Sequence, residues 1–213
     1  MDVTKKYNQD YYTWYKKIGE YGAIFNKHKF DRFIDNDDVV LDFGCGGGYL
    51  LDAINCKEKF GVEINPVAIE EAGKKFKIFK SSQELQENFF NKIISNQVLQ
   101  HCENPRKELI NLYKSLKPEG KIIAVVACSG IELDYKEGDI NFQLYSWSPM
   151  NLGNLLKSCG YKVIQTKKII SKWPPKYEYF HKFFGIKFFN IISYLYGYLN
   201  KNKISQCIAI AKK

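Results

Sequence analysis

Arginine is almost absent from this sequence of 213 residues. Arg32 and Arg106 are its only arginines, although lysine and arginine together number 32 and the formal net charge is +9. A basic chain attracts phosphate, nucleic acid or anionic lipid, but arginine is the side chain that recognises bases and phosphates through paired hydrogen bonds. A positive charge made of lysine, beside abundant Asn, Ile, Tyr and Phe, is typical of an AT-rich coding sequence. We therefore expect no nucleic-acid partner.

Three further features are missing. No two cysteines form a C-x-x-C pair, so a zinc site is not expected. No run of about eighteen apolar residues is present, and the first residues, MDVTKKYNQDYY, contain no apolar signal-peptide core. We expect a cytoplasmic protein with reduced thiols that behave as small buried hydrophobes. The cysteines are Cys45, Cys56, Cys102, Cys128, Cys159 and Cys207.

The length suits one domain with a full core. Short apolar runs, typical of buried parallel strands, alternate with helical segments. The strands are expected at 39–44, 59–64, 76–80, 91–96, 120–127, 161–170 and 203–213. This alternation predicts an α/β fold with a doubly wound, mainly parallel, seven-stranded sheet. We divide the domain 1–213 into an N-terminal helical cap (1–36), a core (37–170), a helical insertion (171–202) and the last strand (203–213).

A glycine-rich turn follows the first predicted strand. It runs from Asp42 through Gly44 and Gly46 into a helix, a pattern that lets the backbone approach a ligand closely. Glu63 comes at the end of the next strand, about twenty residues on, where a carboxylate suits the two hydroxyls of a ribose. The pattern predicts a nucleotide-type ligand.

The charge at this turn separates two candidate ligands. The dinucleotide motif G-x-G-x-x-G, started at Gly44, requires glycine at position 49, which is Tyr49. The carboxylate of Asp42, just ahead of the glycines, would repel a pyrophosphate. The methionine part of S-adenosylmethionine (SAM) carries an ammonium and a sulfonium, which a carboxylate attracts. The sequence therefore favours SAM over NAD.

Several segments resemble the class I SAM-dependent methyltransferase family. VVLDFGCGGG (39–48) is similar to its motif I, and GVEINPVAIEEA (61–72) to the segment that follows. NKIISNQVLQHCENP (91–105) resembles motif IV, and LKPEGKIIAVV (116–126) the strand-five motif. The order covers about residues 37–170. More loosely, DINFQLYSWSPMNLGNLL (139–156) looks like small methyltransferases of cell-surface glycan biosynthesis.

The resemblance implies SAM as the methyl donor, with S-adenosylhomocysteine as product, and it assigns roles around it. It places Glu63 on the ribose, Ile64 against the adenine, and Asn96 beside the cofactor and acceptor cleft. Ser81 and Ser82 fall where the family commonly has an acid for the adenine amine, so that contact departs from the pattern. The residues around the methionine end are Asp42, Gly44, Cys45 and Gly46.

His101 is the candidate general base, because it follows the fourth strand at the edge where ligands bind in this fold and its ordinary pKa suits proton transfer at neutral pH. The alternative, which has slightly more weight, is that His101 only hydrogen-bonds backbone and shapes the loop. A hydroxyl or amine acceptor needs a base, whereas a phosphate or carboxylate oxygen does not.

Aromatic side chains are placed where an acceptor pocket is expected. Tyr11 and Tyr12 precede the first strand, and Tyr145 and Trp147 lie in the loop after strand five; all four are candidates to wall the pocket, and all could equally be packing residues. The aromatic, lysine-studded insertion 173–200 has three interpretations: a lid, a dimer contact or a helix on an anionic membrane.

Three functions remain open. The first is methylation of a small, polar or anionic acceptor: a sugar, a sugar nucleotide or a phosphorylated precursor of a surface polysaccharide. The second is methylation of a lipid or quinone at a membrane. The third is SAM binding without catalysis. The sequence allows a monomer or a homodimer.

Overall fold

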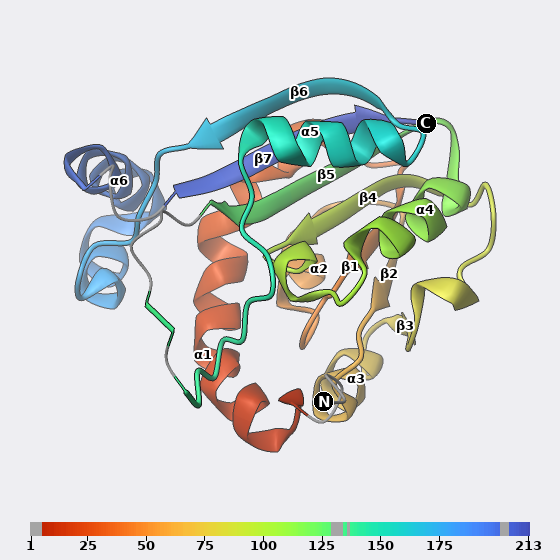
Figure 1. The fold of residues 1–213 in the computed structure, drawn as a ribbon. Helices are drawn as coiled ribbons and strands as arrows, with labels where there is room; N and C mark the ends of the chain where they lie inside the picture. The colour runs from red at the N-terminus through yellow and green to blue at the C-terminus, as the bar shows by residue number, and fades with distance from the viewer. Residues whose placement is uncertain (1–5, 129–133, 136, 201–204) are drawn as a thin grey trace.

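The computed structural model describes residues 6–128, 134–135, 137–200 and 205–213. It is built around one seven-stranded sheet in the order β3-β2-β1-β4-β5-β7-β6 (Figure 1). The strands are β1 (Val39–Phe43), β2 (Glu58–Val62), β3 (Lys77–Phe79), β4 (Phe90–Asn96), β5 (Leu116–Cys128), β6 (Lys162–Ile169) and β7 (Ser205–Lys212). β7 is antiparallel to both β5 and β6, and the other pairings are parallel. The predicted doubly wound, mainly parallel fold is confirmed.

Helices alternate with the strands. The α-helices are α1 (Gln9–Asn26), α2 (Tyr49–Ala53), α3 (Pro66–Gly73), α4 (Pro105–Ser115), α5 (Pro149–Ser158) and α6 (Tyr177–Leu199). Short 3-10 helices are η2 (Lys27–Lys29), η3 (Asp31–Phe33), η4 (Ser82–Glu84) and η5 (Leu99–His101). Three of the α-helices begin with a polar cap followed by proline, a combination that satisfies a free backbone N–H and presets the first turn. The cap side chains of Asn65, Asn104 and Ser148 each accept from a backbone N–H at 3.0–3.1 Å.

The side chains of the strands alternate between two hydrophobic cores, one on each face of the sheet. Leu41, Ile93 and Ala209 pack with α4 and α5 on one face. Val40 and Ile94 pack with α2 and the segment around η2 and η3 on the other. Asp42 follows Leu41 on β1, so it shares the second face with Val40. This assignment decides which side chains meet at the carboxyl edge of the sheet.

The structure differs from the sequence expectation at two turns. The segment SSQELQENF (81–89) is typical of a short helix after the third strand, yet only η4 forms there. Lys-Pro-Glu-Gly at 117–120 is typical of a turn that ends a helix, but the segment belongs to β5, which starts at Leu116. The register between β5 and β4 shifts between Phe90 and Lys92. Parts of the predicted cap, insertion and last strand, at 1–5 and 201–204, lie outside the described residues.

Two of the expected free thiols are joined. Cys128 of β5 and Cys207 of β7 form a disulfide with their Cα atoms 5.9 Å apart. Cys207 pairs with Val126 across the antiparallel ladder, so Cys128, two residues along, projects to the same face. The other cysteines, Cys45, Cys56, Cys102 and Cys159, are free.

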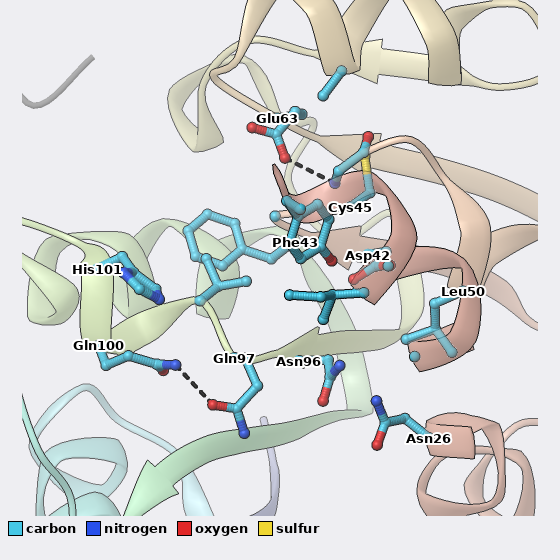
Figure 2. Close-up of a pocket in the computed structure, with 18 of the residues that line it drawn as sticks. Asn26, Asp42, Phe43, Cys45, Leu50, Glu63, Asn96, Gln97, Gln100 and His101 are labelled. Carbon is cyan, nitrogen blue, oxygen red and sulfur yellow. Dashed lines mark hydrogen bonds between the residues drawn. The ribbon is translucent and has the colours of Figure 1, made fainter. Parts of the chain in front are cut away.

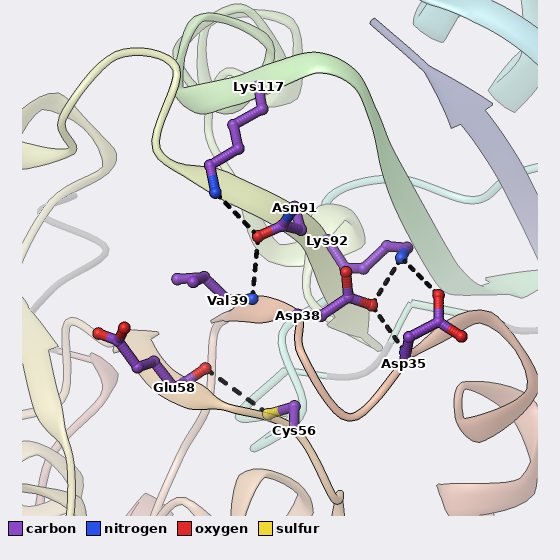
Figure 3. Close-up of polar contacts among 8 residues, drawn as sticks. All are labelled: Asp35, Asp38, Val39, Cys56, Glu58, Asn91, Lys92 and Lys117. Atoms are coloured by element: carbon purple, nitrogen blue, oxygen red, sulfur yellow. Dashed lines mark hydrogen bonds and ion pairs between the residues drawn. The ribbon is translucent and has the colours of Figure 1, made fainter.

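A polar cluster closes the amino edge of the sheet (Figure 3). The buried Lys92 ammonium lies 2.6 Å from an oxygen of Asp38 and 3.5 Å from one of Asp35. Asn91 accepts from the backbone N–H of Val39 at 3.0 Å. The charge of Lys92 is therefore neutralised inside the protein, as a buried ammonium requires.

α6 carries exposed apolar side chains and is kinked at Gly185, which has φ 72°. Phe183, Ile191 and Leu199 are among those that face outward. In the part of the chain that the structure describes, no helix combines the length and the apolar character needed to cross a bilayer.

Candidate active site

A cavity of about 870 Å³ opens at the carboxyl edge of the sheet. Its walls come from α1, from the loops after β1, β2 and β4, and from α6. Figure 2 shows part of this lining, from Asn26 at the end of α1 to His101 after β4. Ligands of open α/β sheets bind at this edge. The size is within the range of pockets that hold small molecules.

The glycine loop after β1 has a shape that only glycine permits. Gly44 has φ +77°, and a Cβ there would lie 2.3 Å from a methyl of Val98. Gly46 has φ +54°, a left-handed value that costs ordinary residues about 1–2 kcal/mol. The N–H of Gly44 donates to the carbonyl of Val62 at 2.8 Å, which ties the loop to β2. The backbone therefore forms a fixed, open floor for a ligand.

Glu63 joins this loop to the end of β2. One carboxylate oxygen accepts from the N–H of Gly46 at 2.8 Å, and the other from Ile64 at 2.8 Å and Asn65 at 2.9 Å. Burial raises the pKa of Glu63, while these N–H donors act in the opposite direction. The carboxylate is thus held in one orientation at the edge of the cavity, where the sequence placed a ribose.

Asp42 lies deeper and is 2% exposed. Its Oδ1 is buried and has no hydrogen-bond partner among the described residues. Burial, with the charge of Glu63 as a second cause, raises the pKa of Asp42 to about 8. A carboxyl group without a partner in such a place suits a cationic group of a ligand, as the ammonium and sulfonium of SAM would be.

Further buried polar atoms with no partner in the described part of the chain belong to residues that line the same cavity. They are Oδ1 of Asn96, Nε2 of Gln97, Oε1 of Gln100 and the hydroxyl of Tyr7. Gln97 also has φ 62°, and its side chain accepts from the amide of Gln100 at 2.8 Å (Figure 2). Buried polar groups are normally satisfied, and a left-handed backbone is often kept at functional sites. Both features indicate a ligand at the end of β4.

His101, on η5, lines the cavity opposite Asp42 (Figure 2). Its Nδ1 lies 3.4 Å from the carbonyl oxygen of Phe142, and its ring meets that of Tyr7 edge to face. Burial is the first cause that lowers the pKa of His101. The imidazole is therefore largely neutral at pH 7. A hydrogen on Nδ1 would leave the lone pair of Nε2 free to accept a proton.

The aromatic face of α1 covers the glycine loop. The hydroxyl of Tyr12 lies 3.0 Å from that of Tyr49, and it would be 2.8 Å from a Cβ at Gly47. Tyr11 lines the cavity beside Tyr15. Both predicted residues, Tyr11 and Tyr12, thus lie at the cavity.

The remaining cofactor candidates differ in how free they are. Cys45 is buried and Ile64 is 42% exposed, and both line the cavity. Ser81 caps η4 through its hydroxyl. The hydroxyl of Ser82 donates to Glu108 at 2.6 Å and accepts from Asn111. The side chain of Ser82 is therefore already engaged with α4.

Tyr145 and Trp147 were expected to wall the acceptor pocket, but neither is among the residues that line the cavity. The hydroxyl of Tyr145 donates to the carbonyl of Glu103 at 3.0 Å. Trp147 packs against the core on the α4–α5 face. The loop after β5 thus turns these two rings away from the cavity.

The structure also brings in residues that the sequence analysis did not single out. Lys29 and Asn26 come from the end of α1 and η2, and Gln206 comes from β7. Trp173 and Phe189 enter from the insertion. The aromatic content of the insertion was a signal for a wall of the pocket, whereas Lys29 sits in a lysine-rich stretch typical of a solvated surface.

The fold and the site together define a class I methyltransferase. The defining features are a doubly wound sheet, a glycine loop after β1, an acid at the end of β2, and beneath the loop an acid without a partner among the described residues. The sequence profile of the family described as "Methyltransferase domain" matches residues 16–166. The chain belongs to this family, and it is a SAM-dependent methyltransferase.

Curated relatives and solved structures agree with this class. The ubiquinone biosynthesis O-methyltransferase of Rickettsia canadensis is 25% identical over 177 residues, covering 72% of this chain and 74% of that protein. The Rickettsia typhi protein of the same name is 25% identical over 149 residues, covering 58% of each. A SAM-dependent methyltransferase from Archaeoglobus fulgidus superposes with a TM-score of 0.66 at 19% identity, covering 95% of this chain and 99% of that one. Phosphoethanolamine N-methyltransferase 2 of Haemonchus contortus, solved with phosphomonomethylethanolamine and S-adenosylhomocysteine, gives 0.63 at 17% identity, covering 93% and 57%.

Proposed function

We propose that the chain transfers a methyl group from SAM to a hydroxyl on an aromatic acceptor of the quinone-precursor kind. The observation that carries this proposal is that one cavity is lined both by a cofactor end, at Asp42 and Glu63, and by an aromatic end, at Phe25, Trp173 and Phe189. The rings of Phe25 and Phe189 stack at 3.8 Å, and Trp173 meets Phe25 at 5.2 Å. A flat apolar acceptor suits such walls better than a sugar does.

Two further observations support this acceptor class. The curated relatives carry the name ubiquinone biosynthesis O-methyltransferase. The exposed apolar side chains of α6 lie on the helix that also contributes Phe189 to the cavity. An acceptor with a lipid tail would reach the cavity past this helix. A sugar, a sugar nucleotide or a phosphorylated glycan precursor remains the alternative, and the polar atoms around Asn96 are compatible with it.

The proposed roles of the cofactor-binding residues follow from their geometry. Glu63 would accept from the ribose hydroxyls, and the backbone of Gly44 and Gly46 would lie against the methionine part. Asp42 would pair with its ammonium. The adenine would rest on Ile64, with the backbone near Ser81 in reach of its amine, because the hydroxyl of Ser82 is engaged elsewhere.

When bound, SAM supplies a methyl group on a sulfonium, which needs no acid to leave. The chain therefore has to align the acceptor oxygen and take its proton, and alignment provides much of the acceleration. Asn96 and Gln97 present unpaired amide atoms that would orient the acceptor. His101, neutral and at the cavity wall, would accept the hydroxyl proton on Nε2.

The test is methyl transfer from radiolabelled SAM to catechol-bearing quinone precursors and, in parallel, to sugar nucleotides. We expect methylated catechol as product, and a much lower rate for Glu63→Ala. Transfer to sugar nucleotides alone would refute the aromatic acceptor. Lack of SAM binding would refute the arrangement of the cofactor end.

A further inference from the structure

The end of the cavity remote from the glycine loop contains a buried lysine. Lys29 is only 6% exposed, and it lines the cavity together with Asn26, Gln206 and the rings of Trp173 and Phe189. Its Nζ donates to Oδ1 of Asn26 at 2.6 Å and to Oε1 of Gln206 at 2.6 Å. Both partners are neutral amides, so the ammonium is oriented but its charge is not compensated.

Among the residues with described burial, the other buried lysine is Lys92, and its charge is compensated. Lys92 pairs with the carboxylate of Asp38 at 2.6 Å. No carboxylate of the described residues pairs with Lys29. An ammonium without a counterion in an apolar wall is unfavourable by several kcal/mol, and an apolar side chain of similar size would be more stable there. Such a residue is a candidate for a functional site.

The charged and titratable groups around Lys29 do not supply the missing charge. His28 is its chain neighbour, and Lys172 lines the same cavity. Asp42 also lines it, but β1 and β7 are separated by β4 and β5, which places the two strands roughly 14 Å apart. β7 and α6 contribute the neutral amides of Gln206 and Asn190. Burial lowers the pKa of Lys29 to about 7, as expected for an ammonium without a counterion.

Lys29 and the cofactor end share one face of the sheet. Asp42, Asn96 and Gln206 alternate with residues of the opposite core, so their side chains point to the face on which η2 packs. Figure 2 shows Asp42, Asn96 and Asn26 in succession along one side of the cavity. An acceptor bound near Asn96 can therefore extend along this face of the sheet to Lys29.

We propose that Lys29, oriented by Asn26 and Gln206, binds an anionic group of the methyl acceptor, a carboxylate or a phosphate. This inference rests on the proposed methyl transfer and specifies its acceptor. Two of the three ammonium hydrogens are used by the amides, and the third is available to the anion. β4 and β7 lie roughly 10 Å apart, so the anion and the methylated oxygen belong to opposite ends of the acceptor.

The test measures binding of three small probes to the whole chain saturated with S-adenosylhomocysteine. Benzoate and phenyl phosphate carry the anion on a ring, and benzamide is their neutral counterpart. We expect at least one anion to bind about tenfold or more tightly than benzamide, the scale of one charge-assisted hydrogen bond. Which anion binds distinguishes a carboxylate acceptor from a phosphate one.

Lys29→Met should abolish the preference for the anionic probe over benzamide and leave the affinity for S-adenosylhomocysteine unchanged. Lys29→Arg should retain it at pH 9, where the native ammonium has lost its proton. Gln206→Leu, which removes one orienting oxygen, should weaken it and provides a test if the methionine variant does not fold. Lys157→Met removes an exposed charge on α5 and is the matched control.

The inference is wrong if neither anion binds the native chain better than benzamide, or if Lys29→Met keeps the preference. In both cases normal binding of S-adenosylhomocysteine would leave the proposed methyl transfer standing. Failure to bind S-adenosylhomocysteine at all would instead refute the proposed function.

Discussion

The affinity for the cofactor should depend on pH through Asp42. Its pKa of about 8 in the ligand-free chain means that about a tenth of the molecules carry the carboxylate at pH 7 and about a hundredth at pH 6. The ammonium of the ligand favours the ionised form, so binding releases a proton and affinity is lost as the pH falls through 8. Because apparent affinity scales with the competent fraction, we expect about a ninefold rise from pH 6 to pH 7.

Above pH 8 the gain from Asp42 is less than about twofold, since the group is already half ionised. At still higher pH the α-ammonium of the ligand loses its own proton, and with it the attraction to the carboxylate. The affinity should therefore pass through a maximum above pH 8 and then fall. Isothermal titration with S-adenosylhomocysteine, in buffers of different ionisation enthalpy, should show release of close to one proton at pH 7.

Asp42→Asn should bind S-adenosylhomocysteine more weakly. Its affinity should also no longer fall as the pH drops from 8 to 6, which is the acidic limb of the pH profile. His101 is another titratable group that lines the same cavity, so His101→Gln must retain the loss of affinity at low pH for the assignment to Asp42 to hold. An affinity in the native chain that is flat between pH 6 and pH 7.5, or a limb equally steep in Asp42→Asn, would refute the reasoning.

Four further outcomes follow from the described contacts. Glu63→Ala should weaken cofactor binding by about 1.5–3 kcal/mol, the scale of charge-assisted hydrogen bonds. It should also lower the melting temperature, because three backbone N–H groups lose their acceptor. A cofactor affinity within twofold of the native chain would contradict the proposed role. Gly44→Ala should destabilise the chain by more than about 2 kcal/mol in denaturant unfolding, whereas Gly73→Ala, where a Cβ meets nothing within 4 Å, should not. Lys92→Met should cost about 3–5 kcal/mol by leaving its carboxylate partner buried and unpaired, and a loss below 1 kcal/mol would show that water reaches the site. If the acceptor is a hydroxyl, His101→Ala should lower turnover by about 10²–10⁴-fold, and the residual rate should rise with pH. The affinity for the cofactor should stay near normal. A large loss of cofactor binding would instead mean that His101 shapes the loop.

Features that depend on neighbours in the chain could be predicted from the sequence. The glycine-rich turn pattern favours a left-handed backbone at Gly44 and Gly46, and Asn65 followed by Pro66 is typical of a helix start. Glu63 was placed at the end of β2 because strand length and spacing are local. Each of these depends on backbone sterics or hydrogen bonds within a few residues.

Features that depend on the order of strands could not be predicted in this way. Lys29 stands in the stretch Lys27–Lys29, which is typical of a solvated surface, and its burial requires Gln206, 177 positions away, as a partner. The disulfide partner of Cys128 likewise depends on β7 lying next to β5. The directions of Tyr145 and Trp147 depend on the path of a loop, and the hydrophobic periodicity of the sequence does not predict such a path.

The place of β7 has a consequence for synthesis on the ribosome. β6 contacts the rest of the sheet through β7 alone in the order of strands, and β7 is formed by residues 205–212. Until those residues have left the exit tunnel, one side of β5 is unpaired and β6 has no strand to pair with. Such exposed strand edges can pair with other chains. The nascent chain can assemble the glycine loop early, but Gln206, which orients Lys29, is made only after the other six strands. A chain truncated before β7 would thus be able to form the floor of the cofactor site and unable to complete the opposite wall.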